Sequence, residues 1–254
     1  MEVTFLGVGE AFDERVANTA ILVRVAAGGE GTALLLDCGF SVPARFWELR
    51  LGPDELDGVW LSHFHADHTF GLPALLVRFW EERRRKDLHI LGQKGVQQFT
   101  ESCIELAYPG FLQRLTYALR FVEVEPGQAV STLGCSWSTA VNDHSQRDLA
   151  LRLTAAGKSL FYSGDGRPTP ETTALARGVQ LLIHEAFRVR TPVAGHGTAA
   201  GCLAMAESCQ AEQLALVHIH REVRRERLAA IRELAAATPG VKVLVPEPGD
   251  RLMI

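Results

Sequence analysis

The chain lacks the sequence features of a membrane protein, a secreted protein and a broadly basic nucleic-acid-binding protein. Its 254 residues contain no run of about 18 consecutive apolar residues, so a membrane-spanning helix is not expected. The first residues, MEVTFLG, form neither a basic region nor a long apolar stretch, so a signal peptide is not expected either. The formal net charge of −4 excludes a globally basic surface for non-specific nucleic-acid binding, while leaving room for a local basic patch.

Cysteine is also scarce. The chain has five cysteines, and no two of them form a Cys-x-x-Cys pair: Cys38, Cys103, Cys135, Cys202 and Cys209. An odd number without paired spacing does not indicate a disulfide framework and is typical of free or buried thiols in a reducing compartment. We therefore expect a cytoplasmic protein.

Apolar residues make up 47% of the chain and charged residues 22%, as in ordinary globular proteins that bury a core. Short apolar runs bounded by Gly, Pro or Asp predict β-strands at Val3–Leu6, Ile21–Val25, Ala33–Leu36, Val59–Leu61, His89–Leu91, Phe121–Val124, Ser159–Tyr162, Leu181–Ile183, Leu214–Val217 and Val241–Val245. The helical period predicts helices at Leu72–Lys86, Gly95–Ala107, Thr198–Ser208 and Arg224–Ala237. Because no linker-like stretch divides the chain, we expect one α/β domain spanning residues 1–254.

Two charged runs are expected at helix ends. The run Glu81–Lys86 should close the helix that begins at Leu72, where cations complement the negative end of the helix dipole. The run Arg221–Arg227 should open the last helix. We expect both to be solvent-exposed faces rather than phosphate-binding patches, with Arg221 as the exception because it closely follows a candidate metal ligand.

Histidine is concentrated in one short segment. Three of the nine histidines and one aspartate fall within the hexapeptide His63-Phe-His-Ala-Asp-His68. The segment follows the apolar run Gly58–Ser62 and precedes a predicted helix, which places it in a loop at the carboxyl end of a strand. Imidazole and carboxylate ligands together suit Zn²⁺, Mn²⁺ or iron. Because alternate residues of an extended stretch point the same way, His63 and His65 can bind one ion, while Asp67 and His68 can reach a second.

One hexapeptide cannot fill two coordination spheres, so further ligands are expected after other strands. His144, Asp165 and His218 each follow an apolar run. Asp165 lies between two glycines, which allow the backbone to turn, and its two carboxylate oxygens could bridge two cations. The expected ligands are His63, His65 and His144 on one ion and Asp67, His68 and His218 on the other, with Asp165 bridging. Two ions about 3.5–4 Å apart can hold a hydroxide between them, so metal-bound water is the expected nucleophile and no Ser or Cys nucleophile is needed.

The pattern His63-x-His65-x-Asp67-His68, followed by the three later ligands, resembles the signature of the metallo-β-lactamase superfamily. The order and spacing of the ligands agree over nearly the whole chain. The resemblance implies an α/β fold of the αβ/βα sandwich type, in which two mixed β-sheets are flanked by helices and the metals lie at one edge. Neither composition nor periodicity predicts that sandwich.

Later segments resemble the ribonuclease Z branch of the superfamily. Leu182–Phe187 is similar to its His-Glu-Ala-Thr motif, the segment from His196 to Ala199 to its His-Ser-Thr motif, and Leu216–Arg221 to its last ligand segment. This branch contains tRNA 3′-processing endonucleases and smaller phosphodiesterases. The resemblance therefore implies phosphodiester hydrolysis with two divalent cations, zinc being the first choice and manganese or iron the alternatives.

The resemblance also implies roles for individual residues. Asp67 would ligate a metal and act as the general base, and His184 would donate a proton to the leaving oxygen as the general acid. His196 would hydrogen-bond a phosphate oxygen. The alternatives are a buried structural residue at a strand end for His184 and a helix-start residue for His196. His220 departs from the branch, where a small polar residue is common, and is either a phosphate contact or a surface residue.

Two departures argue against a tRNA-processing enzyme. The relatives that cleave tRNA carry a Pro-x-Lys-x-Arg-Asn-type stretch in the N-terminal loop, whereas residues 10–19 here retain Asn18 and Thr19 but contain no Pro or Lys. Many of those enzymes also place a tRNA-binding arm between the positions of His144 and Asp165, where residues 145–164 leave room for two strands and a turn. Because affinity for nucleic acid comes largely from Lys and Arg, we expect a small or cyclic phosphodiester or a short nucleic-acid end as the substrate.

Other functions stay open at this point. The same scaffold supports lactonases and thioesterases, although none of the three tyrosines lies within a ligand motif, where a lactonase would use one. A ribonuclease Z-like endonuclease without the usual arm, a non-catalytic metal protein and a di-iron redox protein are further alternatives. No membrane partner is expected, extended nucleic acid is an uncertain one, and a homodimer is suggested by resemblance alone.

Overall fold

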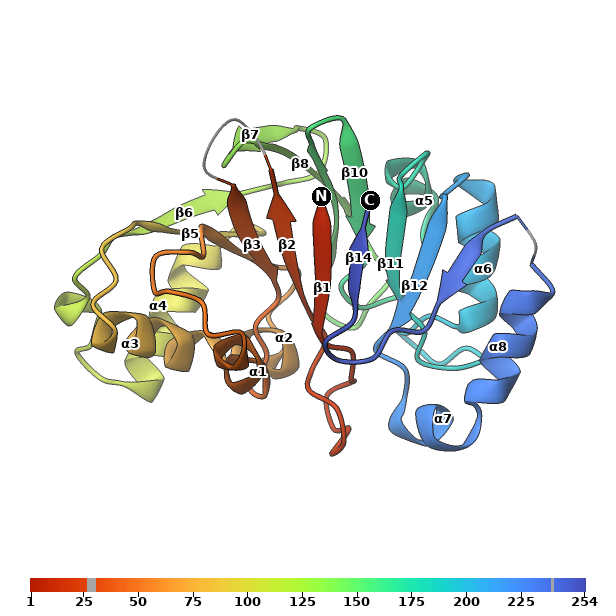
Figure 1. Ribbon diagram of the computed structural model, residues 1–254, viewed down its shortest axis with the longest axis horizontal. Helices are drawn as coiled ribbons and strands as arrows, with labels where there is room; N and C mark the ends of the chain where they lie inside the picture. Colours follow the sequence, from red (N-terminus) through yellow and green to blue (C-terminus); the bar gives the residue numbers. More distant parts are fainter. Residues whose placement is uncertain (27–30, 239) are drawn as a thin grey trace.

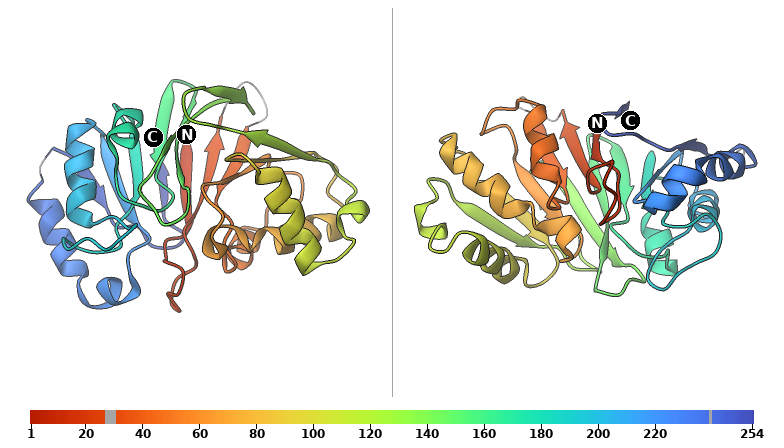
Figure 2. Two further views of the ribbon diagram at one scale, coloured as in Figure 1. Left: turned by 180° about the vertical axis from the view of Figure 1, so that it is seen from behind. Right: turned by 90° about the horizontal axis from the view of Figure 1, so that it is seen from below.

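The computed structural model describes residues 1–26, 31–238 and 240–254, in which two β-sheets lie face to face with helices on their outer sides (Figures 1 and 2). The first sheet has the strand order β14-β1-β2-β3-β4-β5-β6 and the second β13-β12-β11-β10-β9-β8-β7. Both sheets are mixed, because β3 to β6 and β10 to β13 run parallel while the remaining pairs are antiparallel. The predicted sandwich of two mixed sheets flanked by helices is confirmed.

The strands of the first sheet are β1 (Glu2–Gly7), β2 (Ala20–Val25), β3 (Thr32–Leu36), β4 (Gly58–Leu61), β5 (Leu88–Gly92), β6 (Leu119–Glu123) and β14 (Arg251–Met253). Those of the second are β7 (Val130–Thr132), β8 (Cys135–Val141), β9 (Leu149–Ala155), β10 (Lys158–Tyr162), β11 (Leu181–Glu185), β12 (Gln213–Val217) and β13 (Lys242–Leu244). Each predicted strand overlaps one of these. The strands β7, β8 and β14 were not predicted; β7 and β14 have three residues each, which are too few to show a period of two. The strand β9 lies in the interval 145–164, where room for two strands was expected.

The helices are divided between the two outer faces. The first sheet is covered by α1 (Val42–Glu48), α2 (Ala66–Thr69), α3 (Leu72–Glu81), α4 (Val96–Ala107) and the short η1 (Leu112–Arg114), and the second by α5 (Pro170–Leu175), α6 (Ala199–Ser208), α7 (Arg221–Glu226) and α8 (Leu228–Ala236). None of these described helices is both long and apolar enough to cross a membrane.

Three apolar layers hold the sandwich together. The central layer lies between the sheets, where Trp60 of β4 and Trp137 of β8 pack with ring centroids 6.2 Å apart. Each outer layer lies between a sheet and its helices. Central strands such as β2 are apolar at nearly every position because both of their faces are buried: Ile21 points to the central layer and Leu22 to an outer one.

Two helix predictions need correction. The helix predicted at Leu72–Lys86 ends at Glu81, because Arg83 adopts a left-handed conformation with φ of 63° that turns the chain out of the helix. The helix predicted at Arg224–Ala237 is instead two helices, α7 and α8, separated at Arg227, whose φ of −131° is not helical.

The run Glu81–Lys86 is also not a uniformly exposed face. Arg84 is fully buried and donates hydrogen bonds to the carbonyl oxygens of Pro53, Leu56 and Asp87. Its guanidinium therefore joins the loop before β4 to the loop before β5. A charged side chain is stable at such a place because backbone acceptors pair with both terminal nitrogens of its guanidinium.

Replacing Arg84 by Ala should lower the free energy of unfolding by about 3 kcal/mol, because it leaves three carbonyl groups without their charged donor. Urea denaturation measures the loss. Arg85→Ala, an exposed neighbour in the same run, is the matched control and should change the value by less than about 0.5 kcal/mol. Equal losses in the two variants would contradict a structural role specific to Arg84.

Candidate metal centre

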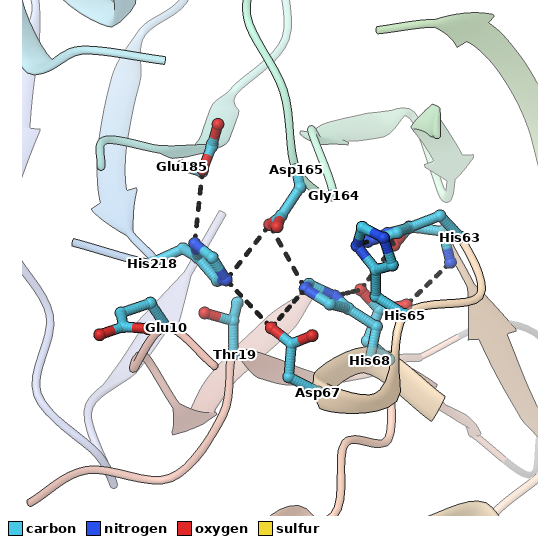
Figure 3. Close-up of polar contacts among 12 residues, drawn as sticks. Glu10, Thr19, His63, His65, Asp67, His68, Gly164, Asp165, Glu185 and His218 are labelled. Atoms are coloured by element: carbon cyan, nitrogen blue, oxygen red, sulfur yellow. Dashed lines mark hydrogen bonds and ion pairs between the residues drawn. The ribbon is translucent and has the colours of Figure 1, made fainter. Parts of the chain in front are cut away.

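The candidate site lies where several strands of both sheets end. The hexapeptide His63–His68 follows β4, Asp165 follows β10, Glu185 ends β11 and His218 follows β12. Because β10, β11 and β12 are parallel neighbours, their carboxyl ends lie at one edge of the second sheet. Figure 3 shows the side chains from these segments pointing toward one another. The structure thus brings the seven predicted ligands to one place.

The first group of donors contains only histidines. His63, His65 and His144 have ligand nitrogens that lie within 4.8 Å of one another. Nε2 of His63 is 3.0 Å from Nδ1 of His65, and Nε2 of His144 is 3.2 Å from the same atom. Three histidine nitrogens this close together could supply three of the four ligands of a zinc ion.

The second group mixes carboxylates and histidines. Asp67, His68, Asp165 and His218 also have donor atoms within 4.8 Å of one another. Nε2 of His68 lies 3.3 Å from both Asp67 Oδ2 and Asp165 Oδ1. Nε2 of His218 lies 3.3 Å from Asp67 Oδ2 and 3.4 Å from Asp165 Oδ1. Asp165 is therefore grouped with the second set of ligands, beside the first.

In several of these histidines, Nδ1 contacts an oxygen atom of the protein, as is usual for histidines that bind a metal through Nε2. Nδ1 of His68 lies 2.7 Å from Asp37 Oδ2, Nδ1 of His144 lies 2.6 Å from the carbonyl oxygen of Gly195, and Nδ1 of His63 lies 3.0 Å from Ser62 Oγ. Such partners fix the ring and the tautomer of metal-binding histidines, leaving Nε2 as the ligand atom.

Two of the converging atoms have no hydrogen-bond partner among the described residues. These atoms, Nε2 of His68 and Oδ1 of Asp165, are both buried. Buried polar atoms nearly always have hydrogen-bond partners in proteins. Two buried atoms without such partners at the centre of a donor cluster are therefore consistent with a bound cation. The donor set therefore suits two divalent ions.

The pKa shifts of the residues in the second group are also consistent with a bound cation. Burial opposes the charged form of His68 and His218, yet the carboxylate of Asp165 and other nearby acids raise the pKa of both histidines well above its usual value. Burial likewise opposes ionisation of Asp67, but its hydrogen bond with His218 and its 3.3 Å contact with His68 hold its pKa below the usual range. The carboxylates at this position thus favour positive charge, which cations would supply.

Local backbone geometry places these ligands. Asp67 and His68 lie on the single turn of α2, directly after the extended residue His65. Gly164 and Gly166 on either side of Asp165 have φ values of 62° and 108°, and a side chain on Gly164 would collide with the Asp148 carboxylate. These glycines therefore allow the turn that directs Asp165 into the site.

His184 does not lie where its predicted role requires. Strand residues alternate between faces, so Ile183 points to the central layer while Leu182 and His184 point toward α6. The His184 ring is fully buried against Phe161, and its Nδ1 lies 2.9 Å from the carbonyl oxygen of Glu185. In this structure the His184 ring therefore points away from the two donor groups, toward α6, and its role as the proton donor stays a prediction.

Glu185, which the sequence pattern did not single out as a site residue, is the residue of β11 that reaches the site. Its Oε1 accepts hydrogen bonds from the backbone N–H groups of Gly166 and Gly197 at 2.8 and 2.7 Å. Its Oε2 lies 3.0 Å from Nδ1 of His196 and 3.4 Å from Nδ1 of His218. The period of two along a strand could have identified it, since adjacent residues cannot face the same side.

His196 lies beside the second donor group. Its side chain is 24% exposed, and its ring stacks on Phe187 at 4.3 Å. Burial lowers its pKa, but the hydrogen bond and charge of Glu185 outweigh burial, so the pKa is raised. The His196 imidazole therefore lies beside the second donor group, with Nδ1 engaged by Glu185.

His220 and Arg221 have structural partners. His220 is largely buried and caps α7, its Nδ1 accepting a hydrogen bond from the backbone N–H of Glu222 at 3.3 Å. Arg221 donates to Oε1 of the buried Glu10 at 2.7 Å, joining the N-terminal loop to α7. His220 is thus not the surface residue of one prediction, and the Arg221 guanidinium is already paired.

The fold and the site together place the chain in the metallo-β-lactamase superfamily, in its ribonuclease Z-like branch. Within the superfamily, residues 1–234 match the family described as "Anti-Pycsar protein Apyc1", and the chain belongs to that family. It is a hydrolase of the metallo-β-lactamase fold related to ribonuclease Z and to phosphodiesterases.

Similar proteins cover most of the chain. Ribonuclease BN of Citrobacter koseri is 26% identical over 271 residues, which cover 86% of this chain and 89% of that protein. The metallo-β-lactamase fold protein YhfI from Bacillus subtilis superposes with a TM-score of 0.80 at 21% identity over 99% of each chain. The short form of human tRNase Z superposes with a TM-score of 0.79 at 21% sequence identity, over 100% of this chain and 99% of that one. Zn²⁺-bound PqqB from Methylobacterium extorquens superposes with a TM-score of 0.73 at 16% sequence identity, over 100% of each chain. At these identities the solved structures show a shared fold.

Metal-free protein titrated with Zn²⁺ should bind two ions per chain. At a free concentration about 100 times the dissociation constant, the unfolding temperature should rise by about 5–10 °C, because the ions bind the native donors alone. Elemental analysis and thermal unfolding measure the two effects.

His144→Ala removes one of three donors from the first group and should leave one ion bound. His89→Ala, on β5 and outside both groups, is the control and should retain two. Loss of one ion in both variants would argue against the assigned groups.

Proposed function

We propose that the chain is a dinuclear metal-dependent phosphodiesterase for small or cyclic phosphodiesters. The observation that carries the proposal is the Glu185–His196 pair beside two adjacent donor groups. The groups would place two cations on one side of a substrate and the His196 imidazole on another. That arrangement suits a reaction in which negative charge develops on phosphate oxygens and a leaving oxygen needs a proton.

The predicted ligands keep their proposed assignments, with His63, His65 and His144 holding one ion, Asp67, His68 and His218 the other, and Asp165 bridging. When bound, the two ions would activate water as the nucleophile and stabilise charge on the phosphate. Asp67 is proposed as the general base that takes the proton of the attacking water. Its carboxylate is oriented by His68 and His218, each 3.3 Å from Oδ2. Imidazole and carboxylate donors together favour zinc, with manganese or iron as alternatives.

His196 is proposed to take the role first expected of His184. Because Glu185 holds Nδ1, the Nε2 nitrogen is left to contact the substrate. Glu185 raises the pKa of the ring and so favours its protonated form, from which Nε2 could donate a hydrogen bond to a phosphate oxygen or a proton to the leaving oxygen.

Several features favour a small substrate over an extended nucleic acid. Residues 149–155 and 158–162 form the hairpin of β9 and β10, which takes up the interval where an arm would be inserted. Near the site, Arg221 is paired with Glu10 and Arg167 with Asp143. With these cations neutralised and a net charge of −4, the chain offers little to a long polyanion.

The proposal is tested with bis(p-nitrophenyl) phosphate and protein loaded with Zn²⁺ or Mn²⁺. Metal-dependent hydrolysis is expected, and His63→Ala should lose it because the first donor group is broken. A lactone, a thioester and a precursor tRNA are run in parallel. Turnover of one of these without diester cleavage would refute the proposed substrate class while leaving the metal centre in place.

The proton donor is identified by changing the leaving group. His196→Ala should slow diesters with poor leaving groups by roughly 10²–10⁴-fold and those with good leaving groups much less. His184→Ala is the matched control, because that ring faces the core, and should slow both substrates alike. If His184→Ala slowed mainly the diesters with poor leaving groups and His196→Ala slowed both alike, His184 would be the proton donor, as the sequence analysis predicted.

A further inference from the structure

One buried carboxylate contacts His68 of the second donor group directly and is connected to His63 of the first group through Ser62. Asp37 follows β3 and is fully buried between the sheets. Its Oδ2 lies 2.7 Å from Nδ1 of His68, 2.8 Å from the hydroxyl of Ser62 and 2.6 Å from the hydroxyl of Tyr162. The backbone N–H of Ser62 donates to Oδ1 at 2.8 Å. Asp37 also has a φ of 61°, an uncommon conformation for a residue other than glycine, and this places its carboxylate there.

The Ser62 hydroxyl extends this contact to the first donor group. Ser62 Oγ donates its only proton to Asp37, so the same oxygen must accept from Nδ1 of His63, 3.0 Å away. A continuous path therefore runs from His63 through Ser62 and Asp37 to His68. His63 belongs to the first donor group and His68 to the second.

The path has two possible proton arrangements. When Ser62 donates to Asp37, His63 carries its proton on Nδ1 and presents a bare Nε2 to a cation. If Ser62 turned its proton toward His63, Nε2 would carry the hydrogen and could not bind one. Fixing Asp37 thus selects the tautomer of His63 that binds metal.

We propose that the Asp37–Ser62 link couples the two metal sites, so that a cation bound at His68 prepares His63 for the other. This inference rests on the dinuclear centre of the proposed function. A cation on Nε2 of His68 strengthens the bond from Nδ1–H to Asp37 and orders that carboxylate. The ordered carboxylate holds the Ser62 proton, and the second ion then meets an imidazole already in the required tautomer.

A second acceptor near His63, the carboxylate of Asp148, allows the coupling between the two sites to be tested separately from metal binding at His63. Its Oδ2 lies 3.5 Å from Nδ1 of His63, farther than Ser62 Oγ, and accepts the backbone N–H of Asp165 at 3.2 Å. Without the Ser62 hydroxyl, Asp148 is the remaining acceptor beside His63. Removing that hydroxyl should therefore break the link to His68 while His63 still binds its ion.

The test is a Zn²⁺ titration of the metal-free full-length protein, with species carrying no, one and two ions counted by native mass spectrometry. Ser62→Ala should still bind two ions, but the ratio of the second to the first association constant should fall roughly tenfold. Tyr162→Phe is the matched control: it removes a hydrogen bond to Asp37 without interrupting the path, so it should leave the ratio unchanged. Asp37→Asn, with circular dichroism to confirm folding, should reduce the ratio as Ser62→Ala does.

The outcomes separate two failures. If the wild-type protein does not bind two ions, the dinuclear centre fails and the coupling with it. If it binds two and the ratio is the same in wild-type and Ser62→Ala protein, the coupling is overturned and the centre stands. A tenfold fall in Tyr162→Phe as well would assign the effect to general loosening around Asp37 and would also overturn the proposal.

Discussion

Uncompensated negative charge at the junction of the two sheets is the constraint on which the rest of the site depends. Five acidic side chains, those of Asp37, Asp67, Asp148, Asp165 and Glu185, are buried there, Asp67 being the most exposed of them at 11% of its side chain. Burying a carboxylate costs several kcal/mol unless it is paired and hydrogen-bonded. Backbone N–H groups satisfy part of this demand and histidines another part, and two divalent cations would supply the rest. The same charge that requires cations holds the imidazoles in position to bind them.

Much of the donor set could be predicted because its signal is local. Three histidines and one aspartate within six residues have few structural explanations, and the position of Asp165 and His218 after apolar runs matches their position at strand ends. The structure brings these residues together as that pattern requires. The sandwich itself followed from the resemblance, because strand pairing across the chain, such as β1 with β14, leaves no mark on local periodicity.

What escaped prediction depends on orientation and on long-range partners. His184 and Glu185 are adjacent, and only the face of β11 decides which one reaches the site. Asp37 is joined to Ser62 and Tyr162 by contacts between distant segments, which one sequence cannot reveal. Arg84 sits in a run of charges that would ordinarily be exposed, yet it is buried by the loops that it connects.

The central claim is that the two donor groups hold two cations side by side. Anomalous diffraction at the zinc absorption edge, on crystals of Zn²⁺-loaded protein, tests it most directly. The account predicts two peaks about 3.5–4 Å apart, one beside His63, His65 and His144 and the other beside Asp67, His68 and His218. A single peak, or zinc bound away from these side chains, would contradict it.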